Sequence, residues 1–412
     1  MTLSLNKTTL LLFVPFLMMS SRSTATVVPG TGTFISHVGD NFEDPNWSFV
    51  HNHPKSSQET SFSENGSGGG RKGRSVNGRW FEGPKRGQPD TLRVVATPEG
   101  GLEGSRGSLL MQTLNSGIPG RISNQTEQDD LIVNCTSRLK TNIRPSETPN
   151  FVVRVFLPPP EFWENRSGPH FGLRAGCSAT ATKTTGGFFG GGKTTNEPYW
   201  PGMWIHFRSE TSKNQDKDSA FLKVRGDRLG RDFFVRELDQ FGWWTFGMSI
   251  TPDGQVHYYA SPGVDPLTPE DHLTSQYPYS YRALSFRTFF FNVCNRNDGH
   301  SRSTPFVIDD PQLYLVQADR VAGILQRDID RKARIAAAKK ARAEKIAQQR
   351  QLAIKRAEER KQAQAERRAK MKKQVSSQKS RSPTAQKSNQ RRRGVNSQNH
   401  KSARQGSQSR RR

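Results

Sequence analysis

Residues 241–260, FGWWTFGMSITPDGQVHYYA, constrain the fold of this chain most strongly, because they predict a β-hairpin. Large apolar side chains alternate with smaller or polar ones from Trp243 to Ile250, which is the period-two pattern of a half-buried strand. Pro252-Asp253-Gly254 supplies a turn, since proline presets φ, aspartate bonds its own backbone and glycine accepts a positive φ. A strand of this kind needs a sheet and an apolar layer to cover one of its faces.

The register of the hairpin predicts a candidate binding surface. If Thr251 pairs with Gln255, Met248 faces Tyr258 in the core, and Gly247 lies opposite Tyr259 on the outer face. A missing side chain beside an outward aromatic ring leaves room for a flat ligand, and tyrosine and tryptophan stack on sugar rings while offering a polar group. We therefore predict that carbohydrate contacts come from aromatic and neighbouring side chains, namely Trp243, His257, Tyr259, Trp200 and Trp204. Ordinary core packing is the alternative for the same side chains.

Short strands broken by glycine and proline continue along the chain on both sides of the hairpin. The predicted strands are 92–96, 108–113, 131–139, 151–157, 170–175, 203–208, 220–224, 233–238, 285–295 and 306–316. This spacing, without amphipathic helices between the strands, predicts an all-β domain over residues 33–316, an antiparallel jelly-roll sandwich. Residues 51–79 are rich in serine, glycine and asparagine and are predicted to form a flexible insertion.

The basic charge is concentrated at the C-terminal end. The chain has 412 residues and a formal net charge of +25, but the segment from Gln317 onward holds 30 Lys and Arg against 7 Asp and Glu. This segment contains no Phe, Trp, Tyr or Cys, so it cannot build a packed core. Residues 317–375 are strong helix formers without proline and predict a long basic α-helix. Residues 376–412 carry clustered arginine and no acidic residue, and they predict a disordered polybasic tail.

The helix allows a weak coiled-coil pattern. A heptad can be drawn through apolar positions and then fails at lysines; the apolar positions are Ala322, Leu325, Ile329, Ala336 and Ala343, and the lysines are Lys332 and Lys339. Oligomerisation through the helix is one interpretation. A solvated helix that only keeps the protein soluble is the other.

The N-terminus has the pattern of a secretory signal. Lys7 precedes a short apolar run at residues 10–19, and Ser23-Thr24-Ala25 offers small residues for cleavage. Residues 1–25 are therefore predicted to be a signal peptide, with an uncleaved anchor as the alternative. No other segment is apolar enough to span a bilayer, so the mature chain is expected to be secreted, periplasmic or attached to the cell surface.

Cysteines and carboxylates give two weaker hypotheses. Export permits a disulfide, for which Cys177 and Cys294 are the candidates, and the odd count of three cysteines leaves at least one thiol unpaired within the chain. Four carboxylates near the two ends of the domain would meet if the first and last strands pair: Glu43, Asp44, Asp309 and Asp310. Such an oxygen-rich group suits calcium, and a solvated acidic rim is the alternative.

Three segments, WWTFGMSITPDGQVHYYA, FFFNVCN and PFVIDDPQLYLV, resemble the concanavalin A-like lectin/glucanase superfamily, which includes laminarinase-type glycosidases and laminin-G-like modules. The chain is also similar in character to secreted planctomycete proteins. The superfamily resemblance implies a jelly-roll sandwich, often stabilised by calcium, that binds or cleaves polysaccharide. Laminarinase-type enzymes carry Glu-x-Asp-x-Glu on one strand face, and this chain has no such run, so the resemblance implies no catalytic residue here.

These observations lead to one main functional hypothesis and two alternatives. The main hypothesis is an exported, non-catalytic protein that binds carbohydrate or a cell surface, with the basic tail attached to polyanions. The first alternative is a glycoside hydrolase or lyase with an atypical carboxylate site. The second is an extracellular nucleic-acid-binding or scaffold protein acting through the tail, which is less favoured because the tail has no aromatic side chain to stack on bases. Calcium is the one cofactor that the sequence suggests.

Overall fold

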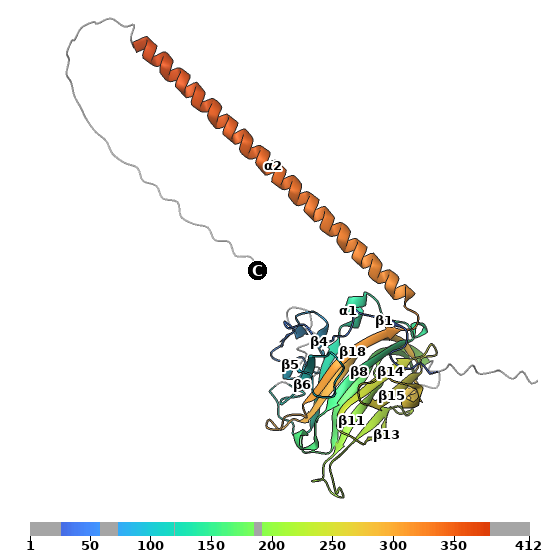
Figure 1. The fold of residues 1–412 in the computed structure, drawn as a ribbon. Coiled ribbons are helices and arrows are strands. Elements are labelled where there is room, and N and C mark those ends of the chain that lie inside the picture. The colour runs from blue at the N-terminus through green and yellow to red at the C-terminus, as the bar shows by residue number, and fades with distance from the viewer. Residues whose placement is uncertain (1–25, 58–72, 119, 185–191, 380–412) are drawn as a thin grey trace, which may run out of the picture. The chain divides into compact units, whose positions relative to one another are not determined.

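The computed structural model describes residues 26–57, 73–118, 120–184 and 192–379, and in these ranges it contains two antiparallel sheets and one long helix (Figure 1). The first, sheet A, has the strand order β16 (His272–Gln276), β15 (Val256–Pro262), β14 (Gly242–Ile250), β8 (Pro149–Leu157), β18 (Phe306–Leu315), β6 (Gly107–Gln112) and β5 (Thr91–Ala96), with β1 (Thr33–Phe34) paired to β18. The prediction of an all-β antiparallel sandwich followed by a long helix is confirmed.

The second sheet, sheet B, contains ten strands in the described part of the chain. Its strand order is β13 (Asp232–Leu238), β12 (Ser219–Arg225), β11 (Gly202–Arg208), β9 (Gly168–Thr184), β17 (Ala283–Arg296), β7 (Thr126–Val133), β4 (Trp80–Glu82), β3 (Arg74–Ser75) and β2 (Phe49–Val50), with β10 (Gly192–Tyr199) paired to β9. The short helices are α1 (Cys135–Leu139), η1 (Pro145–Glu147), η2 (Pro160–Phe162), η3 (Pro269–Asp271) and η4 (Pro278–Ser280).

Aromatic side chains from both sheets fill the core between them. Phe289 of β17 is fully buried and stacks on Phe151 of β8 with ring centroids 4.5 Å apart. Phe291, two residues along β17, is also fully buried. Strand β17 has four strands on each side in the order of sheet B, as expected for a strand that is apolar on both faces.

The predicted hairpin forms with the predicted register. Strands β14 and β15 pair Met248 with Tyr258 and Gly247 with Tyr259. The backbone N–H of Thr251 donates to the carbonyl oxygen of Gln255 at 3.1 Å and closes the turn. The proline-aspartate-glycine turn and the alternating pattern therefore determined this element locally.

Two other local predictions need correction. The strand predicted at residues 131–139 ends at Val133, because residues 135–139 turn into helix α1, which a left-handed Lys140 terminates at a φ of 60°. The predicted flexible insertion at 51–79 is ordered at both of its ends: Lys55 is buried and forms ion pairs with Asp90 at 2.7 Å and Asp129 at 2.6 Å, and Arg74–Ser75 form strand β3. Residues 58–72 lie outside the described residues.

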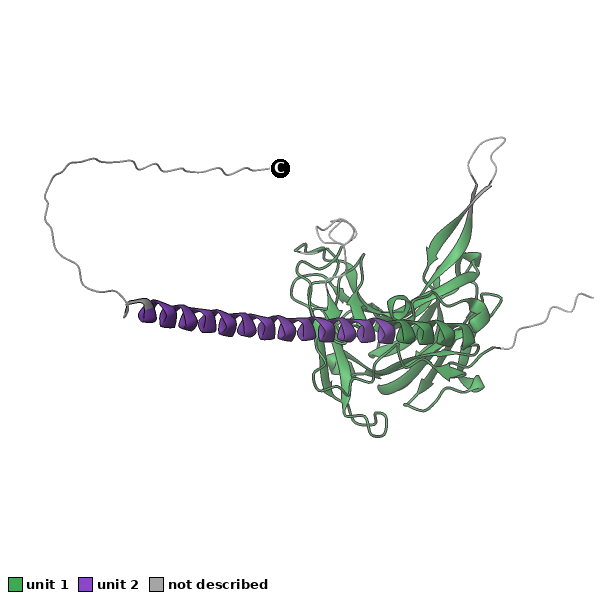
Figure 2. Cartoon of the chain, turned by 90° about the horizontal axis from the view of Figure 1, so that it is seen from above, with its two compact units in different colours: residues 1–331 green, residues 332–412 purple. Residues whose placement is uncertain are grey.

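Helix α2 (Asp319–Lys379) begins inside the sandwich unit. The chain divides into two compact units, residues 1–331 and 332–412 (Figure 2). In the first unit Val321 is fully buried, and the guanidinium of Arg320 holds both carboxylate oxygens of Glu147 at 2.6 and 2.7 Å. In the second unit every helical side chain described is exposed.

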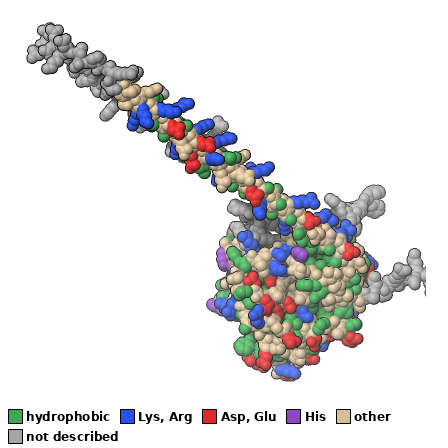
Figure 3. Space-filling view, turned by 45° about the horizontal axis from the view of Figure 1, so that its top comes forward, with side chains coloured by type: hydrophobic (Ala, Val, Ile, Leu, Met, Phe, Trp, Pro, Cys, Tyr) green, Lys and Arg blue, Asp and Glu red, His purple; other side chains and the backbone are tan. Residues whose placement is uncertain are grey.

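The exposed part of α2 has Lys and Arg residues at irregular spacing, so helical periodicity places them on several faces of the helix. Lys and Arg side chains follow the helix along its visible length in Figure 3. The larger apolar residues at 335, 346, 352 and 354 have irregular spacing and do not share one helical face. The coiled coil and an oligomer through the helix stay predictions, and residues 380–412, predicted to be disordered, lie outside the described residues. No helix among the described residues combines the length and the apolar character needed to cross a bilayer.

Candidate functional site

The outer face of sheet B carries two rows of side chains that cross the strands. Strand register places the first row side by side as Phe81, Ile132, Phe290, Arg174 and Gly202, and the second row as Asp130, Asn292, Gly172, Trp204 and Lys223. Residues between them, such as Leu173 and Met203, belong to the core between the sheets. We call these two rows the outer-face site.

Two glycines give the large side chains of this site room to lie across the sheet. A Cβ atom on Gly172 would lie 2.8 Å from Oδ1 of Asn292 and 2.9 Å from Nε1 of Trp204. A Cβ atom on Gly202 would lie 2.5 Å from Cγ of Arg174. Both contacts are closer than a real side chain permits, so the sequence has glycine where the arginine and the tryptophan cross neighbouring strands.

Aromatic rings support the two guanidinium groups of the site. The central carbon of Arg174 lies 5.0 Å from the ring centroid of Trp204 and 5.3 Å from that of Phe290. The guanidinium of Arg225, from β12, lies 4.7 Å from the same tryptophan ring. Trp204 is only 6% exposed, so it acts as a platform for the two cations and the guanidiniums are the groups within reach of a ligand.

Arg174 differs from Arg225 because no described carboxylate contacts it directly, although Asp130 and Asp232 attract it from farther away. Arg225 pairs with Asp232 at 2.9 Å, whereas no carboxylate among the described residues lies within ion-pair distance of Arg174. One Nη atom of Arg174 donates to the carbonyl oxygen of Trp200 at 3.0 Å, and its Nε is buried without a partner in the described part of the chain. Burial and the nearby charge of Arg225 lower the pKa of Arg174 to about 10. A cation in this situation is stabilised by an incoming anion.

A buried amide lies beside the arginine. Asn292 is fully buried, and its Nδ2 donates to Oδ1 of Asp130 at 2.6 Å. Its Oδ1 has no partner among the described residues, although buried polar atoms are normally paired. Burial also raises the pKa of Asp130. Among the described residues the site therefore combines a cation without a direct carboxylate partner and a buried, unpaired acceptor, which suits a ligand that has both a carboxylate and hydroxyl groups.

A cavity of about 300 Å³ adjoins the outer-face site. Its lining comes from the same face of sheet B and from the segments at its edge, and includes Phe81, Pro84, Ile132, Asn134, Gly176, Pro198, Trp200, Arg287 and Thr288. Trp200 is 36% exposed, and Nζ of Lys85 lies 5.2 Å from its ring centroid. Of the five predicted carbohydrate-contact residues, the structure brings two to this face, Trp200 and Trp204.

The other three predicted contact residues lie on sheet A, and the structure contradicts their predicted exposure. Tyr259 is fully buried against Val152 and Leu267, and the space over Gly247 is filled by Pro29 and Leu267. The N-terminal segment of the sandwich thus covers the outer face of the hairpin. Strand alternation identified the outer face but could not show that another segment packs on it.

Trp243 and His257 are buried for similar reasons. The indole Nε1 of Trp243 donates to the carbonyl oxygen of Pro98 at 3.2 Å, and its ring packs edge-on against Phe156. The ring nitrogens of His257 lie 2.9 Å from Oγ1 of Thr251 and 2.6 Å from Oγ of Ser275. Both side chains are satisfied within the protein and leave no surface for a sugar.

The buried histidine gives a prediction about pH. Burial lowers the pKa of His257 from 6.5 to about 4, so the unfolded chain takes up a proton before the folded chain does as the pH falls. His257 alone therefore lowers the free energy of unfolding by up to about 3 kcal/mol between pH 6.5 and pH 4. We expect His257→Gln to flatten this part of the stability profile, measured by denaturant unfolding at a series of pH values. An unchanged slope, matching that of the exposed control His300→Gln, would contradict it.

Three of the four carboxylates predicted to bind calcium, Glu43, Asp44 and Asp309, accept hydrogen bonds from different groups. Glu43 accepts the backbone N–H groups of Arg106 at 2.7 Å and Gly107 at 3.1 Å. Asp309 accepts the hydroxyl of Ser105 at 2.7 Å, and Asp44 accepts the backbone N–H of Asn46. The described residues contain no group of three or more His, Cys, Asp or Glu side chains placed to hold a metal ion. Asp310, the fourth predicted carboxylate, therefore belongs to no such group. The first and last strands do pair, through β1 and β18, but this pairing does not bring the four carboxylates together.

The predicted disulfide is wrong. All three cysteines are free and buried, including Cys135. Cys177 of β9 pairs with Phe286 of β17, whereas Cys294 lies eight residues farther along β17. At a rise of about 3.3 Å per residue the two cysteines are over 20 Å apart, and a disulfide needs Cα atoms within about 7 Å.

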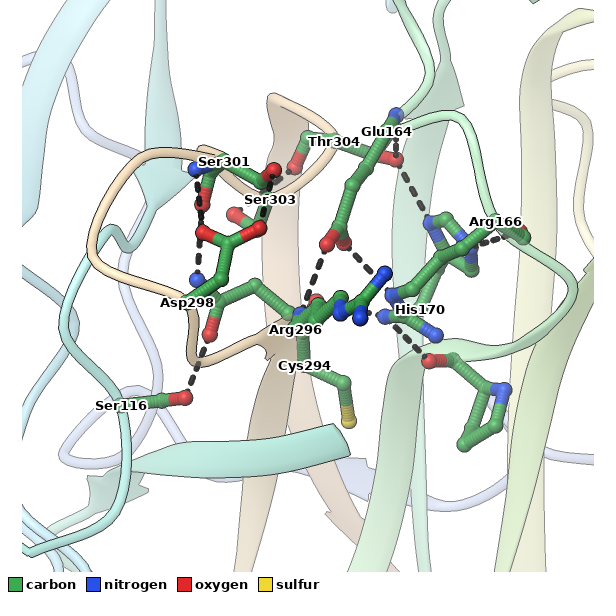
Figure 4. A network of polar contacts seen from close by, with 12 residues as sticks. Ser116, Glu164, Arg166, His170, Cys294, Arg296, Asp298, Ser301, Ser303 and Thr304 are labelled. Carbon is green, nitrogen blue, oxygen red and sulfur yellow. Dashed lines mark hydrogen bonds and ion pairs between the residues drawn. The ribbon is translucent and has the colours of Figure 1, made fainter. Parts of the chain in front are cut away.

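A network of polar side chains, which the sequence did not reveal, connects neighbouring segments at one end of sheet B (Figure 4). Glu164 holds Nε of Arg166 at 2.8 Å and the backbone N–H of Arg296 at 2.7 Å. The imidazole of His170 bonds the hydroxyl of Thr304 at 2.7 Å. These contacts join the segment before β9 to the end of β17 and to the loop that follows it, so they fix the strands on which Arg174 and Asn292 lie.

Comparison with family models and with curated proteins found no match. Solved structures with a similar arrangement include an alginate lyase from Pseudomonas aeruginosa, with 10% identity, 55% of this chain and 87% of that chain covered, and a TM-score of 0.29. A second is the CBM2 module of the evolved Dit protein of Lactobacillus casei BL23 phage J-1, with 10% identity, 56% of this chain and 81% of that chain covered, and a TM-score of 0.28. A third is an endo-β-1,4-glucuronan lyase from Trichoderma reesei, with 12% identity, 54% of this chain and 86% of that chain covered, and a TM-score of 0.25. These values are too low to place the chain in a family.

Proposed function

We propose that this protein is an exported binding protein for acidic polysaccharide, and that the outer-face site of sheet B recognises the carboxylate of a uronic acid residue. The observation that carries the proposal is Arg174, a guanidinium stacked on Trp204 and Phe290 with no carboxylate in ion-pair distance among the described residues. Keeping a partly buried arginine unpaired costs stability, and a carboxylate ligand offsets that cost.

The chemistry of the site matches the chemistry of such a sugar. A guanidinium binds a carboxylate through two parallel N–H donors, which fixes the orientation of the ligand as well as its charge. The free Oδ1 of Asn292 would accept a sugar hydroxyl if the side chain moved slightly to expose it. Neutral polysaccharide would leave the cation of Arg174 unpaired, so we expect acidic chains to be preferred.

The basic tail is proposed to add a second, less specific attachment. Residues 332–412 hold 27 Lys and Arg against 4 Asp and Glu, and Lys and Arg side chains follow the described part of the helix along the face seen in Figure 3. Attraction between a polycation and a polyanion needs no particular sequence and weakens steeply as salt rises. The tail would therefore raise the association rate and the affinity at low salt, while the sandwich would determine which polymer is bound specifically.

A comparison at two salt concentrations tests this division of roles. We expect a variant truncated after Arg331, where the sandwich unit ends, to lose most of the salt-sensitive binding, which the tail provides. The same variant should keep the binding that persists at high salt, which the sandwich provides. The measurement is affinity electrophoresis or calorimetry with a polyuronate, and a neutral glucan serves as the control polymer. Truncation that abolishes all binding, at low and at high salt, would contradict the role of the sandwich and favour a polyanion or nucleic-acid protein that acts through its tail.

Polysaccharide cleavage at the same face is supported less well. Hydrolysis generally needs two positioned carboxyl groups. The described carboxylates on this side of sheet B already have partners, since Asn292 donates to Asp130, Arg225 pairs with Asp232 and Arg208 pairs with Glu237. Incubation of the full mature chain with the bound polymer distinguishes the two functions, because new reducing ends or a new double bond would show cleavage.

A further inference from the structure

We propose that the cavity beside Arg174 binds a second sugar residue of the same acidic chain, so that the protein reads at least two consecutive residues of its ligand. This inference rests on the function proposed above and deepens it. It requires that the cavity be continuous with the outer-face site, and that its lining suit a sugar ring with a negative charge at one edge.

The cavity and the outer-face site share their walls. Gly176 lines the cavity and lies two residues beyond Arg174 on the same face of β9, a step of about 7 Å. Ile132, also in the lining, is the cross-strand neighbour of Phe290, on which Arg174 is stacked. The backbone carbonyl oxygen of Trp200 accepts a hydrogen bond from Arg174, so the residue whose ring lines the cavity is bonded directly to the cation of the site.

The lining has an apolar wall and a basic rim. Phe81, Ile132 and Pro198 supply apolar surface, and Trp200 exposes more than a third of its area. Lys85 lies over the tryptophan ring at 5.2 Å, and the exposed Arg287 lines the cavity. A sugar ring can stack its C–H face on the indole while its carboxylate meets these cations.

The size and polarity of the cavity narrow the choice of ligand. A cavity of about 300 Å³ is at the lower limit of ligand pockets, so it suits one sugar ring rather than a branched or folded chain. Oδ1 of Asn134, a lining residue, has no partner among the described residues. A small movement of this side chain would let Oδ1 accept a sugar hydroxyl, which a purely apolar ligand would not offer.

The test is the dependence of affinity on the length of the ligand. Calorimetry of the full mature chain with uronate monomers, dimers and tetramers is expected to show an increase of about tenfold or more once a second residue is present. Trp200→Ala is expected to remove this increase while keeping the affinity for the shortest ligand that binds. Phe162→Ala, which alters an aromatic residue that is 60% exposed and outside the cavity lining, is the matched control and should leave the length dependence unchanged.

Each result separates this inference from the function on which it rests. Binding that does not strengthen with length, or a loss in Trp200→Ala that is the same at every length, would overturn the second-residue pocket and leave the first site intact. Failure of the unaltered chain to bind any uronate would instead overturn the proposed function itself. Arg287→Gln provides a second variant at the exposed rim, and we expect it to weaken the tetramer more than the shortest ligand.

Discussion

Replacing Arg174 with methionine is expected to reduce affinity for a uronate oligomer by about 10- to 100-fold, because hydrogen bonds to a charged group contribute about 1.5–3 kcal/mol. The same variant is expected to fold with equal or greater stability. Methionine keeps the apolar stem against Trp204 and Phe290 while removing a cation that has no counter-ion among the described residues. Calorimetry measures the affinity, and thermal unfolding measures the stability.

The combination of these two results is what distinguishes a binding role from a structural one. Arg93→Gln, an exposed arginine on β5 of the opposite sheet, is the matched control for loss of one positive charge. If Arg174→Met unfolds more easily and binds as well as the unaltered chain, Arg174 is a structural residue and the outer-face site has no part in binding.

Replacing Phe289 with alanine is expected to destabilise the sandwich by about 3–5 kcal/mol, the usual cost of removing a buried aromatic side chain. Phe289 is fully buried, it stacks on Phe151 of the opposite sheet, and its ring meets Phe291 edge-on. Its removal leaves a cavity where both sheets meet, in a core that is close-packed. Denaturant unfolding followed by tryptophan fluorescence gives the free energy of unfolding.

Phe234→Ala is the control for this prediction. Phe234 belongs to β13, which is an edge strand in sheet B, and it is 47% exposed. We expect its replacement to cost less than about 1 kcal/mol, as at most surface positions. Equal losses in the two variants would show that the contact between the sheets through Phe151 and Phe289 is not central to stability.

The sequence predicted well what short-range pattern and turn chemistry determine. The hairpin at 241–260 has the predicted register because its turn and its alternation agree, and β17 is central because Phe289, Phe290 and Phe291 make it apolar on both faces. The long helix follows from composition alone.

The sequence predicted the binding surface poorly, because coverage by distant segments is not a local property. Tyr259 is outward on its strand, yet it packs with Val152 and Leu267, and Val28, from the start of the described chain, packs against the same cluster. Arg174 was missed for the converse reason. Its strand, with Gly172 and Gly176 on either side of an outward arginine, carried a signal in the sequence, but the unpaired charge is visible only once the neighbours of β9 are known.

The two sheets thus use their outer faces differently. The N-terminal segment and Leu267 cover the outer face of the hairpin in sheet A. Together with the hairpin they form a small second hydrophobic cluster on that face. Sheet B has arginine, tryptophan and asparagine side chains on its outer face, with glycines that make room for them. A polymer ligand is therefore expected on sheet B.

Calorimetry at high salt with an acidic oligosaccharide tests the central proposal most directly, because salt suppresses the contribution of the tail and leaves that of the sandwich. The full chain is compared with Arg174→Met, using a uronate tetramer and a neutral glucan tetramer. We predict that the unaltered chain binds the uronate and not the glucan, and that Arg174→Met loses this binding. Equal binding of the uronate by both proteins, or no binding by either, would contradict recognition of an acidic polysaccharide on the outer face of sheet B.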